Sequence, residues 1–194
     1  MDTKSIMIVG VGGQGTLLAS RLLGAALLAE GYDVKVSEVH GMSQRGGSAV
    51  TYVKYGEKVA CPIVQKGQAD LILAFEQLEA ARWLPFLKKD GTIISNTQQI
   101  DPMPVIIGSA QYPEHILDAV RATGARLTQI DALSLAMQAG SAKAVNVVLI
   151  GVMASHMPIA YSVWENAIRA TVPEKFLEMN LKAFSYGYNY KSNS

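Results

Sequence analysis

A glycine-rich turn near the N-terminus is the first candidate for binding chemistry. The stretch Gly10-Val11-Gly12-Gly13-Gln14-Gly15 satisfies the pattern G-x-G-x-x-G. Glycines let the chain turn sharply and bring backbone N–H groups close to an anion at the positive end of the next helix. Three interpretations stay open: tight helix–strand packing without a ligand, binding of a phosphate or other anion, and contact with another subunit. The candidate binding residues of this glycine turn are Gly10, Gly12, Gly13, Gln14 and Gly15.

A second stretch, the His40 segment (residues 38–48), holds further side chains suited to a ligand. Arg45 could bind a carboxylate or phosphate through two parallel hydrogen bonds, and His40 could orient a ligand or take a proton. Its glycines would allow another molecule to approach the backbone closely. The alternative is a mobile surface loop with an ordinary exposed Arg and His. The candidate ligand-binding or partner-facing residues are His40, Gly41, Met42, Ser43, Gln44, Arg45, Gly46 and Gly47, followed by Ser48.

The residue sets for independent catalysis or metal binding are missing from the sequence. Cys61 is the only cysteine, so the chain cannot form an intrachain disulfide, a four-cysteine iron–sulfur cluster or a structural zinc site. The spacing shows no Ser, Cys or Asp partner for His40 and no paired histidines or carboxylate cluster. We therefore expect no catalytic residue and no metal site here, and we expect Cys61 to be a buried, small apolar residue.

Composition excludes several classes of protein. The formal net charge is +1, whereas a nucleic-acid-binding protein needs a basic surplus to neutralise phosphates. No stretch reaches the roughly 20 apolar residues that span a bilayer. The N-terminus lacks the layout of a signal peptide, so we expect a cytoplasmic protein.

The elements that would position both motifs belong to an α/β fold. Ile6–Gly10 is a short apolar run that predicts a buried strand, and Leu17–Leu28 predicts a helix that ends before Gly31. Asp33–Val39 alternates like a second strand, which completes a βαβ unit with a right-handed crossover. We expect a Rossmann-like, mostly parallel sheet flanked by helices, with ligands at the carboxyl ends of its strands.

The rest of the chain continues this pattern and ends in helices. Val145–Ser155 is apolar nearly all the way round, which indicates a helix buried in the core or at an interface. We expect one domain over residues 1–187 with a helical C-terminal region, and a polar tail over residues 188–194. The remaining predicted strands are 49–55, 69–75, 91–95, 105–107 and 126–130, and the predicted helices are 76–87, 114–123, 132–138, 163–171 and 174–186.

Together, the glycine turn and the His40 segment resemble the γ-type domain of 2-oxoacid:ferredoxin oxidoreductases. The His-Gly-Met-Ser-Gln-Arg core is more similar to the β subunits of the indolepyruvate type than to the γ subunits of the pyruvate type. The resemblance extends over essentially the whole chain. Its further matches are Gly67-Gln68-Ala69-Asp70, Glu76 with Glu79-Ala80, the stretch from Asp131 to Gly140, Asn146 to Gly151, Val172-Pro173, Asn180 and Ala183-Phe184.

The resemblance implies a subunit of an enzyme that oxidatively decarboxylates a 2-oxoacid to an acyl-CoA and passes two electrons to ferredoxin. It implies that thiamine diphosphate, its Mg²⁺ and [4Fe–4S] clusters belong to a larger α subunit, and that coenzyme A is a co-substrate. This chain alone would bind no cofactor, and in isolation it could pair as a homodimer. The glycine turn and residues 40–48 would face the partner's active site, with Arg45 contacting a coenzyme A phosphate or the oxoacid carboxylate.

Two other functions remain as alternatives. A self-sufficient NAD- or FAD-binding Rossmann-like oxidoreductase would use Glu38, which lies about 20 residues after the turn, to bind the ribose. A small-ligand sensor or structural module would keep the domain without the enzyme.

Overall fold

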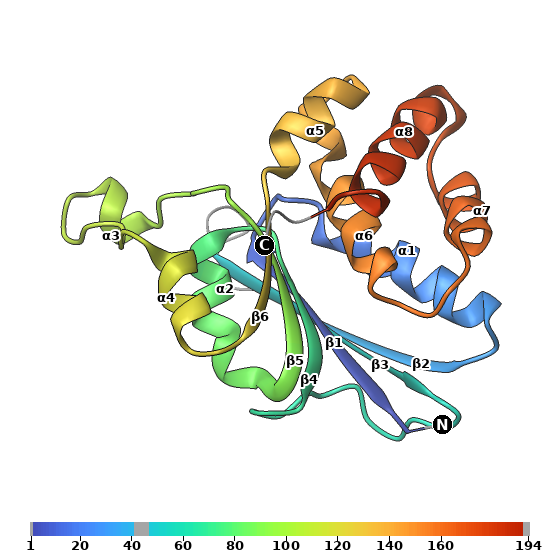
Figure 1. Ribbon diagram of the computed structural model, residues 1–194, viewed down its shortest axis with the longest axis horizontal. Coiled ribbons are helices and arrows are strands. Elements are labelled where there is room, and N and C mark those ends of the chain that lie inside the picture. The colour runs from blue at the N-terminus through green and yellow to red at the C-terminus, as the bar shows by residue number, and fades with distance from the viewer. Residues whose placement is uncertain (1, 41–46, 192–194) are drawn as a thin grey trace.

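The computed structural model of the protein describes residues 2–40 and 47–191 (Figure 1). Its described strands form one sheet with the order β2-β3-β1-β4-β5-β6, in which only β3 runs antiparallel to its neighbours. The Rossmann-like, mostly parallel sheet expected from the sequence is confirmed. The strands are β1 Lys4–Val11, β2 Asp33–His40, β3 Ser48–Gly56, β4 Ala69–Ala74, β5 Leu87–Asn96 and β6 Arg126–Ile130.

Strand β3 lies between the two strands of the expected βαβ unit. β1 and β2 run in the same direction, but each pairs with β3 and not with the other. Residues 41–47 alone connect β2 to β3, and this length suits an antiparallel pair, since a parallel crossover needs a dozen or more residues. The order of the first three strands therefore differs from that of a doubly wound dinucleotide-binding fold, in which the first two strands are neighbours.

Helices cover both faces of the sheet (Figure 1). Because side chains alternate along a strand, Ile6 and Ile8 join the core beneath α1, α6, α7 and α8, whereas Met7 and Val9 join the core beneath α2 and α4. The helices are α1 Thr16–Ala29, α2 Gln77–Trp83, α3 Met103–Ile106, α4 Ile116–Ala122, α5 Ala132–Ala139, α6 Val145–Ser155, α7 Tyr161–Thr171 and α8 Leu177–Tyr188, with 3₁₀ turns at Leu84–Phe86, Ala142–Ala144 and Glu174–Phe176.

The expected buried helix is α6, and other parts of the chain cover it. Every residue from Asn146 to Ala154 is buried. A Cβ on Gly151 would lie 2.3 Å from the carbonyl oxygen of Phe184, and one on Gly187 would lie 2.0 Å from the carbonyl oxygen of Val148. These glycines let the backbones of α6 and α8 touch. The apolar character of α6 therefore reflects core packing and not a subunit interface.

Several local expectations are wrong. Residues 105–107 do not form a strand. Val105 and Ile106 belong to α3, and Ile107 caps its C-terminus. Pro102 and Pro104 favour this helix because proline suits the first turn of a helix and cannot donate a hydrogen bond to a strand ladder. Cys61 is exposed and not buried. The predicted last helix divides into a 3₁₀ turn and α8, which runs to Tyr188. Beyond it, the Tyr190 hydroxyl donates to the carbonyl of Gln129 at 2.9 Å. Within the described part of the chain, no helix is long and apolar enough to cross a membrane.

Candidate functional site

The glycine turn and the end of the His40 segment meet at the carboxyl edge of the sheet. The backbone N–H of Gly12 donates to the carbonyl of Gly47 at 2.9 Å. Val11, the last residue of β1, pairs with Ser48, the first residue of β3. The antiparallel insertion of β3 thus brings together two motifs that the sequence identified separately.

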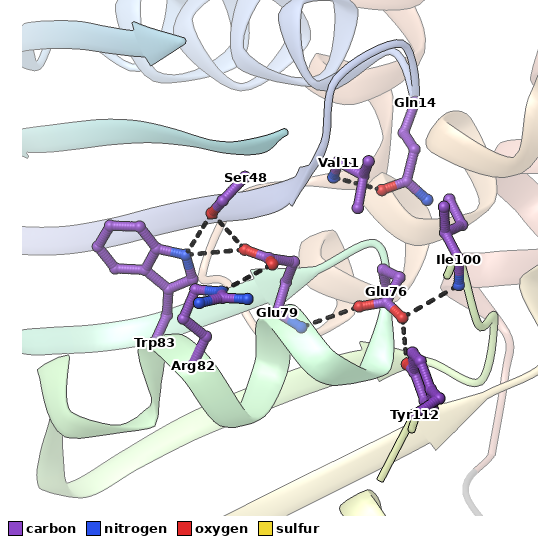
Figure 2. Close-up of polar contacts among 9 residues, drawn as sticks. All are labelled: Val11, Gln14, Ser48, Glu76, Glu79, Arg82, Trp83, Ile100 and Tyr112. Atoms are coloured by element: carbon purple, nitrogen blue, oxygen red, sulfur yellow. Dashed lines mark hydrogen bonds and ion pairs between the residues drawn. The ribbon is translucent and has the colours of Figure 1, made fainter. Parts of the chain in front are cut away.

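The side chain of Gln14 fills the inside of the glycine turn. Its Oε1 accepts a hydrogen bond from the N–H of Val11 at 2.7 Å, which Figure 2 shows. Its Nε2 donates to the carbonyl of Phe75 at 3.1 Å and to Oε1 of Gln98 at 3.3 Å. A Cβ on Gly10 would lie 2.8 Å from Gln14 Oε1, so glycine leaves the space that the glutamine occupies. The turn is therefore tied to the ends of β4 and β5 by one amide side chain.

Gly15 positions the start of α1 against α6. Its φ is +84°, a left-handed conformation that favours glycine, and an added Cβ would lie 2.6 Å from Nδ2 of Asn146. The same Nδ2 donates to the carbonyl of Gly15 at 3.4 Å. Tight packing therefore explains Gly10 and Gly15. Gly13 differs, because its φ is +99° but nothing lies within 4 Å of an added Cβ.

Beside the turn lies a cleft of about 750 Å³. Among its lining residues, all of them described, Lys143 alone carries a charge, and the other polar groups are side-chain amides and glycine backbone. One ammonium group and several amide donors suit an anionic or polar group, and the lining contains no nucleophile with a base beside it. The lining residues are Gly12, Gly13, Gln14, Gly15, Gln98, Ile100, Leu133, Ala142, Lys143, Val145 and Asn146.

A buried carboxylate fixes the start of β3, where the His40 segment ends. Glu79 of α2 is 3% exposed. Figure 2 shows that it accepts hydrogen bonds from the hydroxyl of Ser48 and from Nε1 of Trp83 at 3.2 Å. Arg82 Nε lies 2.9 Å from its other oxygen. The charge of Arg82 and these donors compensate the desolvation of the carboxylate.

A second buried carboxylate lies one helical turn earlier. Glu76 is 1% exposed and caps α2 by accepting from the N–H of Glu79 at 2.9 Å. Its Oε1 accepts from the N–H of Ile100 at 3.2 Å and from the hydroxyl of Tyr112 (Figure 2). Burial and the neighbouring Glu76 carboxylate raise the pKa of Tyr112. This carboxylate therefore joins α2 to two points of the connection between β5 and α4.

Part of the expected site lies outside the described residues. This applies to Gly41, Met42, Ser43, Gln44, Arg45 and Gly46, and also to the side chain of His40. The backbone of His40 pairs with Ala49 at the end of β2. The structure thus places Gly47 and Ser48 beside the glycine turn, and the other end of the segment, in β2, on the far side of β3.

The arrangement of Glu38 does not match a ribose-binding acid. Its Oε1 accepts from the hydroxyl of Ser20 on α1 at 2.9 Å, and Glu38 does not line the cleft. Its strand is separated from β1 by β3. A dinucleotide fold places this acid on the strand next to the glycine turn.

Sequence reasoning missed the cleft's contributors from outside the two motifs. Lys143, Gln98 and Ile100 come from connections whose position depends on the tertiary fold. Asn146 was noted only as part of a matching stretch. The one signal in the sequence was Lys143, the single cation in the segment between the apolar helices α5 and α6.

Comparison with known proteins places this geometry among a group of oxidoreductases. Residues 5–190 match the family model described as pyruvate ferredoxin/flavodoxin oxidoreductase. Indolepyruvate oxidoreductase subunit IorB of Thermococcus kodakarensis is 43% identical over 96% of this chain and 95% of its own length. Pyruvate oxidoreductase subunit PORC of Thermotoga maritima has the same fold, with a TM-score of 0.76, 19% identity and 100% coverage of both chains. The 2-oxoglutarate:ferredoxin oxidoreductase of Magnetococcus marinus, with 2-oxoglutarate, coenzyme A and succinyl-CoA bound, matches 97% of this chain but 31% of its own, with a TM-score of 0.74 and 20% identity.

Proposed function

The chain belongs to the pyruvate ferredoxin/flavodoxin oxidoreductase family, and on that premise we propose that it is the small, γ-type subunit of an indolepyruvate-type 2-oxoacid:ferredoxin oxidoreductase. The observation that carries the proposal is the 43% identity to an indolepyruvate oxidoreductase subunit over nearly the full length of both chains. Fold likeness alone would not support a shared activity, but a full-length relationship of this degree does.

The proposed reaction converts a 2-oxoacid to an acyl-CoA. The bond between the carboxylate and the oxo carbon breaks and carbon dioxide leaves, and the acyl carbon bonds to the sulfur of coenzyme A, whose thiol proton is released. The two electrons of this oxidation pass to ferredoxin. The Magnetococcus marinus protein, which shares this fold, has a 2-oxoacid, coenzyme A and an acyl-CoA bound. The chain takes part as one subunit of the oxidoreductase and is not catalytic alone.

A [4Fe–4S] cluster does not fit the residues of this chain. A [4Fe–4S] cluster takes four thiolates, and the sequence has Cys61 alone. Among the described residues, no group of three or more His, Cys, Asp and Glu side chains could hold a metal ion by themselves. We therefore assign thiamine diphosphate, Mg²⁺ and the [4Fe–4S] clusters to a larger α subunit, through which ferredoxin is reduced.

This chain's contribution is to complete the partner's active site from the carboxyl edge of its sheet. The cleft offers the backbone of the glycine turn, the amide of Gln14 and the ammonium group of Lys143, with no acid among its described lining residues. Such a surface attracts the phosphates of coenzyme A or the carboxylate of the oxoacid. Arg45, two residues before Gly47 in the sequence, is our candidate for a bidentate contact to the same anion.

Subunit-resolved cofactor analysis tests this assignment. The chain is co-expressed with the large subunit from the same host, the complex is purified, and the subunits are separated. We expect thiamine diphosphate and iron to remain with the large subunit. Iron or thiamine retained by this chain would contradict the proposal.

The NAD- or FAD-dependent alternative has its own test. Titrating the isolated chain with NADH, followed by fluorescence, should show no binding at micromolar concentrations. Micromolar binding that is lost in Glu38→Ala would favour the alternative, although Glu38 hydrogen-bonds to Ser20 and does not line the cleft.

A further inference from the structure

The connection between β5 and α4 forms an arm (residues 101–111) that stands away from the helical layers. Figure 1 shows α3, which lies in this arm, apart from the rest of the molecule. Its tip carries three large apolar side chains that are mostly exposed: Met103 at 58%, Ile106 at 65% and Ile107 at 68%. Large apolar side chains gathered on a projecting element mark an interaction surface, whereas isolated exposed ones are ordinary.

The arm is closed by its own backbone hydrogen bonds. The N–H groups of Val105 and Ile106 donate to the carbonyl of Pro102, and those of Ser109 and Ala110 donate to the carbonyl of Pro104, all within 3.1 Å. The two prolines restrict φ where α3 begins. The apolar tip is therefore preformed, which lowers the entropy cost of binding a partner.

A buried carboxylate, Glu76, holds the base of the arm to the body. Glu76 accepts from the N–H of Ile100, on one side of the arm, and from the hydroxyl of Tyr112, on the other (Figure 2). Glu76 is buried and belongs to the well-packed start of α2. Hydrogen bonds to a charged acceptor are stronger than neutral ones, so this carboxylate fixes the direction in which the arm leaves the sheet.

The composition of the arm selects the kind of partner. Asp101 at its base is the one charged residue of the arm, and from Pro102 to Pro113 the sequence contains none. Nucleic acids and anionic membrane surfaces are recognised through basic residues, which this stretch does not offer. An apolar groove on another protein remains as the complementary surface.

We propose that this arm docks its apolar tip, Met103, Ile106 and Ile107, in an apolar groove of the large oxidoreductase subunit. This inference rests on the proposed function and deepens it by naming the docking element. Ile100, at the base of the arm, also lines the cleft. A partner that covers the cleft therefore reaches the arm along the same edge of the sheet.

A second copy of the chain is the competing partner for the arm. The body does offer an apolar groove of about 490 Å³ between α1, α7 and α8, lined in part by Leu18, Val172 and Phe176. An arm inserted into that groove of another copy would build either a head-to-tail array or a two-fold pair in which the copies exchange arms. Both would appear as self-association of the isolated chain.

A charge introduced at the tip tests the proposal. The Ile106→Asp/Ile107→Asp variant is compared with wild type and with Leu28→Asp, which alters a residue 62% exposed at the far end of α1. The equilibrium constant for binding to the purified large subunit from the same host is measured, together with the melting temperature of each isolated chain. We expect the double variant to bind about 30-fold or more weakly, the effect of losing one dominant interface residue. Leu28→Asp should bind like wild type, and all three melting temperatures should agree within a few degrees.

Each outcome separates the two proposals. Unchanged binding of the double variant, with wild type also binding, would overturn the arm as docking element and leave the proposed function intact. No binding of wild type to the large subunit would overturn the proposed function itself. Loss of a wild-type homodimer in the double variant, without an effect on the large subunit, would assign the arm to self-association and overturn the inference.

Discussion

The backbone N–H of Gly12 donates a hydrogen bond to the carbonyl of Gly47 at 2.9 Å, which joins the glycine turn to the end of the His40 segment. This contact depends on β3, whose first residue, Ser48, pairs with Val11 at the end of β1. In a doubly wound dinucleotide fold the strand beside β1 would instead bring an acidic residue to the turn. The antiparallel strand β3 thus takes the place of the strand that carries the acidic residue in a dinucleotide-binding fold. Here the edge of the sheet is formed by the glycine turn, by Gly47 and by side-chain amides.

Gly15→Ala should destabilise the chain more than Gly13→Ala. Both glycines have a positive φ, which costs an alanine roughly 1–2 kcal/mol. Only at Gly15 would the new Cβ meet another atom, Nδ2 of Asn146 at 2.6 Å, and such overpacking adds about 1–3 kcal/mol. Urea unfolding of both variants measures the difference. Equal losses of unfolding free energy would show that Asn146 moves aside without cost.

Gly151→Ala should destabilise the protein strongly because α6 and α8 touch there. The added methyl would lie 2.3 Å from the carbonyl oxygen of Phe184, a backbone atom that cannot rotate away. We expect a loss of about 3 kcal/mol or more in unfolding free energy. Gly24→Ala in α1 is the matched control: nothing lies within 4 Å of its added Cβ, so it should gain up to about 1 kcal/mol. A well-folded Gly151→Ala with wild-type stability would contradict the close crossing.

Alkaline pH should destabilise the protein through Tyr55. Burial, with smaller contributions from Tyr32 and Asp70, raises the pKa of Tyr55 from 10.0 to about 12. Between these values the unfolded chain loses the phenol proton and the native chain keeps it, so stability is full below pH 10 and falls as the pH rises toward 12. The Tyr55 contribution to this loss is roughly 2–3 kcal/mol. Unfolding free energies of wild type and Tyr55→Phe, measured from pH 9 to 12, should diverge by that amount; parallel curves would contradict the shift.

Arg45→Ala should weaken the use of an anionic substrate by the assembled enzyme. A charge-assisted contact contributes about 1.5–3 kcal/mol, so we expect KM for coenzyme A or for the oxoacid to rise roughly 10- to 100-fold. Arg126→Ala is the matched control, because the side chain of Arg126 is 69% exposed at the start of β6 and forms a long ion pair with Asp90, at 3.9 Å. Both KM values are measured by steady-state kinetics of the complex, in which the concentrations of coenzyme A and of the oxoacid are each varied. Unchanged KM values for both substrates would show that Arg45 contacts neither of them.

Much of the fold follows from local sequence patterns. The apolar run of β1, the glycine after α1 and the uniformly apolar α6 each specify their element and its burial. The 105–107 segment misled because its apolar residues suggest a strand, whereas Pro102 and Pro104 favour a helix start. The position of β3 between β1 and β2 was not foreseen, since strand order depends on long-range pairing that no local pattern encodes.

The site was predicted only in part, for the same reason. The glycine turn was found from its spacing, but the role of Gln14 as the side chain that fills it depends on Phe75 and Gln98, which are remote in sequence. Lys143 and Asn146 reach the cleft because α6 packs against α1. The carboxylates Glu76 and Glu79 were noticed by resemblance, and their hydrogen bonds became evident only in three dimensions.

Ferredoxin reduction by the reconstituted enzyme tests the central claim most directly. The chain and the large subunit from the same host are assayed separately and together, with coenzyme A and with indolepyruvate, pyruvate or 2-oxoglutarate as the oxoacid. We predict that reduction requires both subunits and coenzyme A, and that kcat/KM is highest for indolepyruvate. Ferredoxin reduction by this chain alone, or activity of the large subunit that is unchanged when the chain is added, would contradict the account.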